Sequence, residues 1–297
     1  MSLKILKNVN CAEYTSWLVG GEAEHFCLPE NIQQLQEAMD FSKQQNLPVT
    51  ILGGGSNVLI SDQGIPGLTI CLRRFSGVSF ETRDGRIFIQ ALSGTAKSEL
   101  LKIFLKNKLA PALFLAGLPG DVGGGVVMNA GVAESFHPRE FMEFVDSIEV
   151  MNPKGEIHQI NKSDLKISYR HTDGWQPNII TTVNMSWPLE EDLEILNKVK
   201  EANKTRLSKQ PLDMPSCGSV FKNPEGFKAA QLIDQCGLKG FRIGDAQVSL
   251  KHANFIVNLD QARATDIWDV ILHVQKTVLE QKNVQLKTEV VRLGRWS

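Results

Sequence analysis

Two glycine-rich segments are the parts of this sequence whose residue types and spacing most clearly allow chemistry. The first follows an apolar run at residues 48–52, which predicts a buried strand, and consists of Gly53, Gly54, Gly55, Ser56 and Asn57. The second lies at residues 117–125 and contains Gly117, Pro119, Gly120, Gly123 and Gly124. Such glycines let backbone N–H groups surround the oxygens of a phosphate, because no side chain intervenes. Two such cradles predict one long, bent ligand that carries phosphate groups.

The common nucleotide-binding motifs do not explain these segments. A dinucleotide-binding fingerprint would need a third glycine where Val58 stands, and a Walker-type loop would need a Gly-Lys pair, which the sequence lacks. An alternative stays open at this point, namely that each glycine run is a plain turn in a loop and binds nothing.

Charge and composition exclude several classes of partner. The formal net charge is -1, from 32 basic and 33 acidic residues, so no overall positive field is available to hold nucleic acid or an anionic membrane. The five cysteines are widely spaced, and His137, His171 and His252 lack metal-ligand spacing, so we predict neither a disulfide framework nor a metal site. No apolar run is long enough for a signal peptide or a membrane span, which predicts a cytoplasmic protein, and we expect a monomer.

The elements that would position these residues alternate between helical and strand periodicity. Apolar residues at helical spacing predict helices at residues 31–46, 96–108, 193–207, 229–236 and 264–282. Short apolar runs predict strands at 48–52, 87–92, 148–151 and 254–258. Prolines 211 and 215 indicate a domain boundary nearby. We therefore predict an α+β protein with a first domain at residues 1–190, a helical connection at 191–210, and a smaller α+β domain at 211–297.

Several short motifs, spread in order over nearly the whole chain, resemble one known family. They are Thr-Ser-Trp-Leu-Val-Gly-Gly at 15–21, the two glycine segments with Met-Asn-Ala-Gly at 128–131, Ser-Tyr-Arg-His-Thr at 168–172, Ser-Cys-Gly-Ser-Val-Phe-Lys-Asn-Pro at 216–224, Lys-His-Ala-Asn-Phe at 251–255 and Leu-Lys-Thr-Glu-Val at 286–290. Together they resemble the UDP-N-acetylenolpyruvoylglucosamine reductase (MurB) family, and the block at 218–224 is the most specific of them.

This resemblance implies a fold, an activity and two cofactors. The implied fold is an FAD-binding domain of the vanillyl-alcohol-oxidase type, in two subdomains of about 1–75 and 76–190 with non-covalent FAD between them, followed by a substrate domain. The implied reaction is the NADPH-dependent reduction of the enolpyruvyl ether of a UDP-sugar to UDP-N-acetylmuramate, in peptidoglycan precursor synthesis. NADPH and the UDP-sugar would use one cleft in turn.

The resemblance also implies three catalytic residues. Hydride arriving at C3 of the enolpyruvyl group drives negative charge onto C2 and its carboxylate, so the site needs fixed positive charge and a proton for C2. Arg170 matches the family's arginine for the carboxylate or enolate, Ser219 matches its proton donor, and Glu289 matches its third catalytic position. Without the motifs, these residues would be a surface ion-pair partner, a turn residue and a solvated carboxylate.

Further residues are candidates for contacts with the substrate. They are Tyr169, Arg206, Lys209, Lys222 and Asn223, although the cationic ones could equally be parts of a solvated face. Cys217, a thiol two residues before Ser219, predicts sensitivity to oxidation. The short stretch between Arg170 and Ser219 implies the shorter subclass of the family, which lacks a tyrosine-bearing insertion.

Two other functions remain possible from the residues alone. One is a flavin oxidase of the same superfamily that acts on an alcohol or lactone; the first glycine segment has no histidine to tether a flavin covalently. The other is a non-enzymatic nucleotide-binding module, which would have no use for Arg170, Ser219 and Glu289 together.

Overall fold

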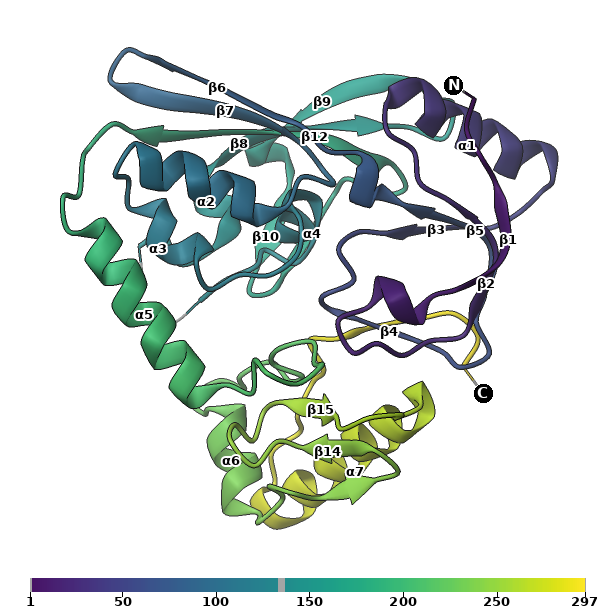
Figure 1. The fold of residues 1–297 in the computed structure, drawn as a ribbon, viewed down its shortest axis with the longest axis vertical. Coiled ribbons are helices and arrows are strands. Elements are labelled where there is room, and N and C mark those ends of the chain that lie inside the picture. Colours follow the sequence, from purple (N-terminus) through teal and green to yellow (C-terminus); the bar gives the residue numbers. More distant parts are fainter. Residues whose placement is uncertain (1, 133–136, 297) are drawn as a thin grey trace. The chain divides into compact units, whose positions relative to one another are not determined.

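The computed structural model describes residues 2–132 and 137–296, and these form two compact units (Figure 1). Each unit combines segments that are far apart in the sequence. The first contains residues 2–5, 26–54, 69–132 and 137–205. The second contains residues 6–25, 55–68 and 206–296. The units are defined by packing alone, so the predicted domain limits near residues 190 and 210 stay a prediction.

A five-stranded antiparallel sheet forms the centre of the first unit. Its strands lie in the order β6 (Val78–Arg83), β7 (Arg86–Leu92), β12 (Ile179–Pro188), β8 (Val145–Met151) and β9 (Ile157–Asn161). The central strand β12 pairs with β7 and β8, and its register places Val183 opposite Ala91 and Ile148. All three side chains are buried, because residues at corresponding positions of paired strands share one face of the sheet.

Three helices pack with this sheet around one apolar core (Figure 1). They are α2 (Lys97–Lys106), α3 (Pro111–Leu115) and α4 (Val122–Val127). The rings of Phe104 and Phe114 meet Phe144 edge-to-face, with centroids 6.0 and 5.7 Å away. This core holds the second glycine segment, which includes most of α4, next to α2.

The remaining elements of the first unit are smaller. Helix α1 (Ile32–Gln44) begins after Asn31, whose side chain accepts a hydrogen bond from the N–H of Gln34, the usual N-cap arrangement. Strand β3 (Val49–Leu52) lies next to β5 (Ile65–Cys71). Strands β10 (Lys166–Ser168) and β11 (His171–Asp173) form a two-stranded hairpin, and α5 spans Ile195–Lys209.

The second unit is built around helix α7 (Ala264–Lys282), whose apolar stripe shares a core with α6 (Ala229–Gln235) and a small sheet. That sheet has the order β13 (Arg242–Ile243), β14 (Ala246–Val248), β15 (Ile256–Asn258). Trp17 joins this core: its Nε1 donates to the carbonyl of Ile256 at 2.7 Å, and its own carbonyl accepts from Asn258 at 3.0 Å. The segment around Trp17, which precedes the first glycine segment, is therefore part of the C-terminal core.

Short strands complete the second unit. Strands β1 (Leu6–Asn10) and β2 (Glu22–Cys27) are neighbours in a sheet, and β16 (Val291–Leu293) pairs in parallel with β4 (Val58–Ile60). The pairing of β16 with β4 places the last residues of the chain beside the strand that follows the first glycine segment.

The structure confirms the predicted α+β content. All predicted helices and strands are present with their ends shifted by a few residues, as α1, α2, α5, α6, α7, β3, β7, β8 and β15. Helix α4 was not predicted, because its sequence is rich in glycine, the poorest helix former after proline. It forms because close packing favours bare backbone there: a Cβ on Gly123 would lie 2.9 Å from Cβ of Ser93. Within the described residues, no helix has the length and apolar character that crossing a membrane requires.

Candidate functional site

The first unit brings the two glycine segments together. The N–H of Gly54 donates a hydrogen bond to the carboxylate of Asp121, and a Cβ added to Gly53 would overlap the same carboxylate. A Cβ added to Gly54 would lie 3.1 Å from Cα of Gly120. The backbones approach so closely that a side chain would occupy the space between them, which is the arrangement expected of a cradle made from main-chain atoms.

Asp121 is the residue that connects the segments. Only 5% of its surface is exposed, and its second carboxylate oxygen accepts a hydrogen bond from Gly124 N–H at 2.6 Å, which caps α4. Arg73 donates to the carbonyl of Gly54 at 3.0 Å from the other side of the first segment. Each glycine segment is thus held by a charged side chain of the same unit.

The rest of the first glycine segment belongs to the second unit. Gly55 has a φ of +70°, and a Cβ there would overlap the carbonyl oxygen of Tyr14, so glycine is required by local packing whatever binds. The side chain of Asn57 donates to the carbonyl of Glu289 at 3.0 Å, and Val291 N–H donates to the carbonyl of Asn57 at 3.0 Å. Asn57 therefore holds the predicted catalytic segment around Glu289.

Ser219 and Glu289 lie on two backbone segments that pair in the second unit. Glu289 N–H donates to the carbonyl of Val220 at 2.8 Å, and Lys222 N–H donates to the carbonyl of Lys287 at 2.9 Å. The predicted proton donor is thus adjacent to the residue that holds Glu289. This juxtaposition joins two parts of the chain whose closeness the sequence does not reveal.

A buried asparagine, Asn254, fixes the segment that carries Ser219. Its backbone carbonyl accepts from Val220 N–H at 2.9 Å, and its side chain both accepts from and donates to the backbone of Phe221, each at 2.9 Å. Three hydrogen bonds therefore constrain the two residues that follow Ser219 in the chain.

Arg170 occupies the turn of the hairpin between β10 and β11 in the first unit. Its φ is +56°, and its guanidinium lies 4.8 Å from the ring centre of Tyr169. A Cβ added to Gly131 would overlap that guanidinium, so the motif glycine makes room for it. Fully buried Asn129 supports the turn by donating to the carbonyl of Ser168 at 3.1 Å.

Cys217 differs from its sequence-based prediction. The thiol is buried, and this burial raises its pKa well above the ordinary value, with the nearby Glu289 carboxylate raising it further. Because the thiolate is the reactive species, a protonated and shielded thiol resists oxidation. The expectation that Cys217 makes the site sensitive to oxidation is therefore wrong.

The predicted substrate contacts have varied surroundings. Tyr169 is 45% exposed beside Arg170, and Lys209 is exposed at the end of α5. Arg206 is partly buried, which lowers its pKa, and its Nε donates to Gln210 at 2.9 Å. Asn223 accepts a hydrogen bond from Ala229 N–H at 3.0 Å and so also stabilises the start of α6. Lys222 is partly buried. Their roles in substrate binding stay predictions.

One buried cation near the glycine segments was not predicted. Lys97 is only 4% exposed, and its Nζ donates to the carbonyl of Pro119 at 2.9 Å. Burial lowers the pKa of Lys97 to about 8, and the carboxylate of Asp121 partly opposes this. A sequence signal was present: Lys97 stands one turn before Leu100 and Leu101, on the apolar face of its helix.

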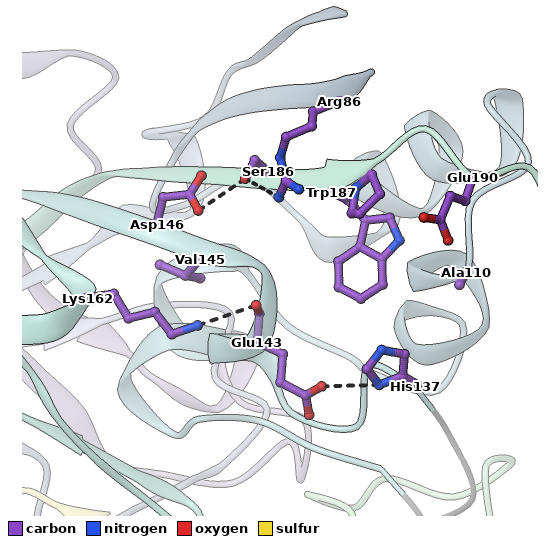
Figure 2. A pocket seen from close by; sticks show the side chains of 11 residues that line it. Arg86, Ala110, His137, Glu143, Val145, Asp146, Lys162, Ser186, Trp187 and Glu190 are labelled. Carbon is purple, nitrogen blue, oxygen red and sulfur yellow. Dashed lines mark hydrogen bonds and ion pairs between the residues drawn. The ribbon is translucent and has the colours of Figure 1, made fainter. Parts of the chain in front are cut away.

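A separate cavity of about 680 Å³ lies at one end of the five-stranded sheet (Figure 2). Several polar groups of its lining interact: Arg86 donates to Ser186 at 2.9 Å, Ser186 donates to Asp146 at 3.1 Å, and His137 lies 3.6 Å from Glu143. None of the predicted site residues lines it. Within residues 2–132 and 137–296, no cluster of His, Cys, Asp and Glu suits a metal ion.

Comparisons with known proteins extend over the whole chain. A family model described as UDP-N-acetylenolpyruvoylglucosamine reductase, C-terminal domain, matches residues 210–293, and one described as FAD binding domain matches residues 23–161. The UDP-N-acetylenolpyruvoylglucosamine reductases of Listeria monocytogenes and Lactiplantibacillus plantarum are 40% and 38% identical to it, over 98% and 99% of this chain and 96% and 95% of theirs. A crystal structure of the enzyme of that name from Thermus caldophilus matches with a TM-score of 0.78 and 32% identity over 99% of both chains.

These similarities confirm an FAD-binding domain followed by the smaller C-terminal domain of the reductase family. Both glycine segments lie inside the match to the FAD binding domain, while Ser219 and Glu289 lie inside the C-terminal match. Arg170 falls between the two matched ranges, so its assignment depends on the motif at residues 168–172 alone.

Proposed function

Because the chain belongs to the UDP-N-acetylenolpyruvoylglucosamine reductase family, we propose that it reduces UDP-N-acetylglucosamine enolpyruvate to UDP-N-acetylmuramate. The protein is an oxidoreductase of peptidoglycan synthesis, FAD is its cofactor and NADPH is its co-substrate. The residues present fit FAD, since Gly53, Gly54 and Gly120 approach so closely that any side chain would fill the space between the two segments.

Gly53, Gly54 and Gly120 would hold FAD, which when bound would supply the hydride chemistry, from NADPH through N5 to C3 of the enolpyruvyl group. The chain's own task is to stabilise the negative charge that develops at C2 and its carboxylate. A guanidinium offers a planar fork of donors and stays charged at all relevant pH values, which suits Arg170 to that carboxylate. Its position in a tight turn above Gly131 holds the group with little freedom.

We assign the proton for C2 to the hydroxyl of Ser219. A serine hydroxyl is a weak acid, so a neighbouring group must assist it, and Arg170, Lys209 and Lys222 are the candidates. Glu289 would hydrogen-bond the forming enol. The hydrogen bond from Glu289 N–H to Val220 supports a shared role, since it keeps the two catalytic segments in register.

The observation that supports this function most strongly is that pairing within the second unit. It unites the motif around Ser219 with the motif around Glu289, and both lie in the range that matches the reductase C-terminal domain. A non-enzymatic module would have no use for such a pairing. The flavin-oxidase alternative is disfavoured because the curated relatives that cover the chain are named as reductases.

The visible spectrum of the purified protein tests the proposal. We expect a yellow protein that is bleached by NADPH and recovers its colour on addition of the enolpyruvyl UDP-sugar without oxygen. In deuterated buffer the product should carry solvent deuterium at C2, because that proton comes from a hydroxyl group that exchanges with solvent, and deuterium also at C3, because the N5–H of a reduced flavin exchanges with solvent. Bleaching without reoxidation by the UDP-sugar would contradict the proposed substrate, and a product without solvent deuterium at C2 would contradict the proposed protonation of C2.

A further inference from the structure

Lys97 makes two contacts with the second glycine segment that together set the direction of its peptides. Its Nζ donates to the carbonyl of Pro119 at 2.9 Å, and its backbone N–H donates to the carbonyl of Gly120 at 3.0 Å. In a trans peptide, the C=O and N–H groups point in opposite directions. The N–H groups of Gly120 and Asp121 therefore point away from Lys97.

These two amides are on the side of the first glycine segment. The nitrogen of Asp121 lies 3.4 Å from the position that a Cβ of Gly54 would occupy. Two successive N–H groups that point the same way, next to bare glycine backbone, are the donors that a diphosphate needs. Lys97 thus binds the carbonyl groups of this backbone, on the face opposite to the N–H groups that would bind the cofactor.

The residues around Lys97 leave room for its buried side chain. A Cβ added to Gly125 would lie 2.9 Å from Cε of Lys97 and 2.8 Å from the ring of Phe141, so the glycine leaves the space that the lysine occupies. The ammonium also lies 5.8 Å from the centre of the Phe141 ring. Asp121 is the charged group that acts on Lys97 in the part of the chain that the structure describes.

Asp121 creates the need for this cation. Its buried carboxylate is bonded to Gly54 and Gly124, inside the region that would receive an anionic diphosphate. Like charges repel strongly where solvent is excluded. We propose that Lys97 is a positioning residue of the FAD site, whose buried ammonium orients the second glycine segment and offsets the negative charge of Asp121 so that a diphosphate can bind.

The proposal implies a particular dependence of FAD affinity on pH. The pKa of Lys97 is lowered to about 8 by burial, so the ammonium is present below that pH and is lost above it. If binding requires the ammonium, the FAD dissociation constant is constant below about pH 8 and then rises by up to about tenfold per pH unit. FAD binding near this pH is accompanied by uptake of a proton.

The stability of the cofactor-free protein has the opposite dependence on pH. Because the pKa of Lys97 is about 8 in the folded protein and 10.5 ordinarily, the unfolded chain binds more protons between these values. The contribution of Lys97 to the free energy of unfolding therefore increases with pH in this window. A purely structural effect on the cradle would make affinity and stability fall together.

The test measures FAD affinity by flavin fluorescence between pH 7 and pH 9, for the full chain freed of cofactor and then titrated with FAD alone. We expect Lys97→Met to raise the dissociation constant at pH 7 by roughly 10²-fold and to abolish its pH dependence, because the carboxylate of Asp121 loses its counter-charge. Lys102→Met is the matched control on the same helix, since Lys102 is 71% exposed and paired with Glu99 at its surface. It should leave both quantities unchanged.

Two further measurements keep the proposal open to refutation if Lys97→Met does not fold. Asp121→Asn should weaken the dependence of FAD affinity on pH, because it removes the negative charge that the Lys97 ammonium offsets. The fall in affinity that remains should move to a lower pH, because the carboxylate favours the charged form of Lys97. Calorimetry of the unmodified protein in buffers of different ionisation enthalpy should show proton uptake on FAD binding. A dissociation constant that is flat from pH 7 to 9, with no proton uptake, would refute the role of Lys97. The inference rests on FAD binding and needs neither NADPH nor the UDP-sugar, so it is tested separately from the proposed reaction.

Discussion

The two candidate functional regions of this protein differ in the groups that they offer to a ligand: one offers backbone and the other offers side chains. In the first unit, Gly53, Gly54 and the second glycine segment present backbone, and Gly54 and Gly120 approach so closely that a Cβ on Gly54 would lie 3.1 Å from Cα of Gly120. In the second unit, Ser219 and Glu289 present side chains, and paired backbone hydrogen bonds hold them in place. The comparison teaches that substitutions should harm the two regions in different ways. Adding atoms should damage the cofactor region, whereas removing them should damage the catalytic region.

The largest effect expected from removing atoms is at Ser219. Ser219→Ala should be bleached by NADPH at the normal rate, because the hydroxyl has no role in that step. Its reoxidation by the UDP-sugar should be on the order of 10² to 10⁴ times slower, the usual loss for a positioned general acid. Stopped-flow absorbance measures both steps on one sample, and rapid reoxidation of the variant would assign the proton to another group.

The largest effect expected from adding atoms is at Gly55. Gly55→Ala should lower the free energy of unfolding by about 3 kcal/mol or more, because the new Cβ overlaps the carbonyl of Tyr14. Gly85 is the matched control: its φ of +69° equals that of Gly55 within a degree, but nothing lies within 4 Å of its Cβ position. Gly85→Ala should cost about 1 kcal/mol. Equal losses in denaturant unfolding of the two cofactor-free variants would show that backbone angle, and not packing, explains Gly55.

A smaller catalytic effect is expected at Glu289. Glu289→Gln keeps the backbone bond to Val220 and changes only the carboxylate, so folding and FAD content should be retained. Reoxidation by the UDP-sugar should slow by roughly ten- to a hundredfold, the size of one hydrogen bond that involves a charged group. Rates of bleaching and reoxidation that fell equally would reassign Glu289 to general binding.

The smallest effect is expected at Cys217, although it is next to the catalytic segment. Since burial raises the pKa of its thiol, native protein at pH 8 should react with a disulfide reagent at Cys217 much more slowly than at the partly exposed Cys236. Cys217→Ala should change reoxidation by less than about threefold. Peptide mapping after timed labelling measures the first quantity, and fast labelling of Cys217 would contradict the buried position.

The sequence predicted the α+β content and the principal helices well, because these depend on local periodicity and caps. Helix α1 with its cap at Asn31 and helix α7 with its apolar stripe are examples. Helix α4 could not be predicted, since glycine disfavours helix locally and only packing against Ser93 and Phe141 compensates.

For the candidate site residues, too, the sequence indicated one part and the tertiary structure decided the other. Residue types indicated glycine backbone for a phosphate, and the resemblance of the motifs to the reductase family implied Arg170, Ser219 and Glu289 for the chemistry. Only the tertiary structure decided that Asn254 and Asn57 hold the catalytic segments and that Lys97 is buried against the second glycine segment. These facts depend on contacts between residues far apart in the chain, and the free energy of such contacts is set by burial, which a linear pattern does not specify.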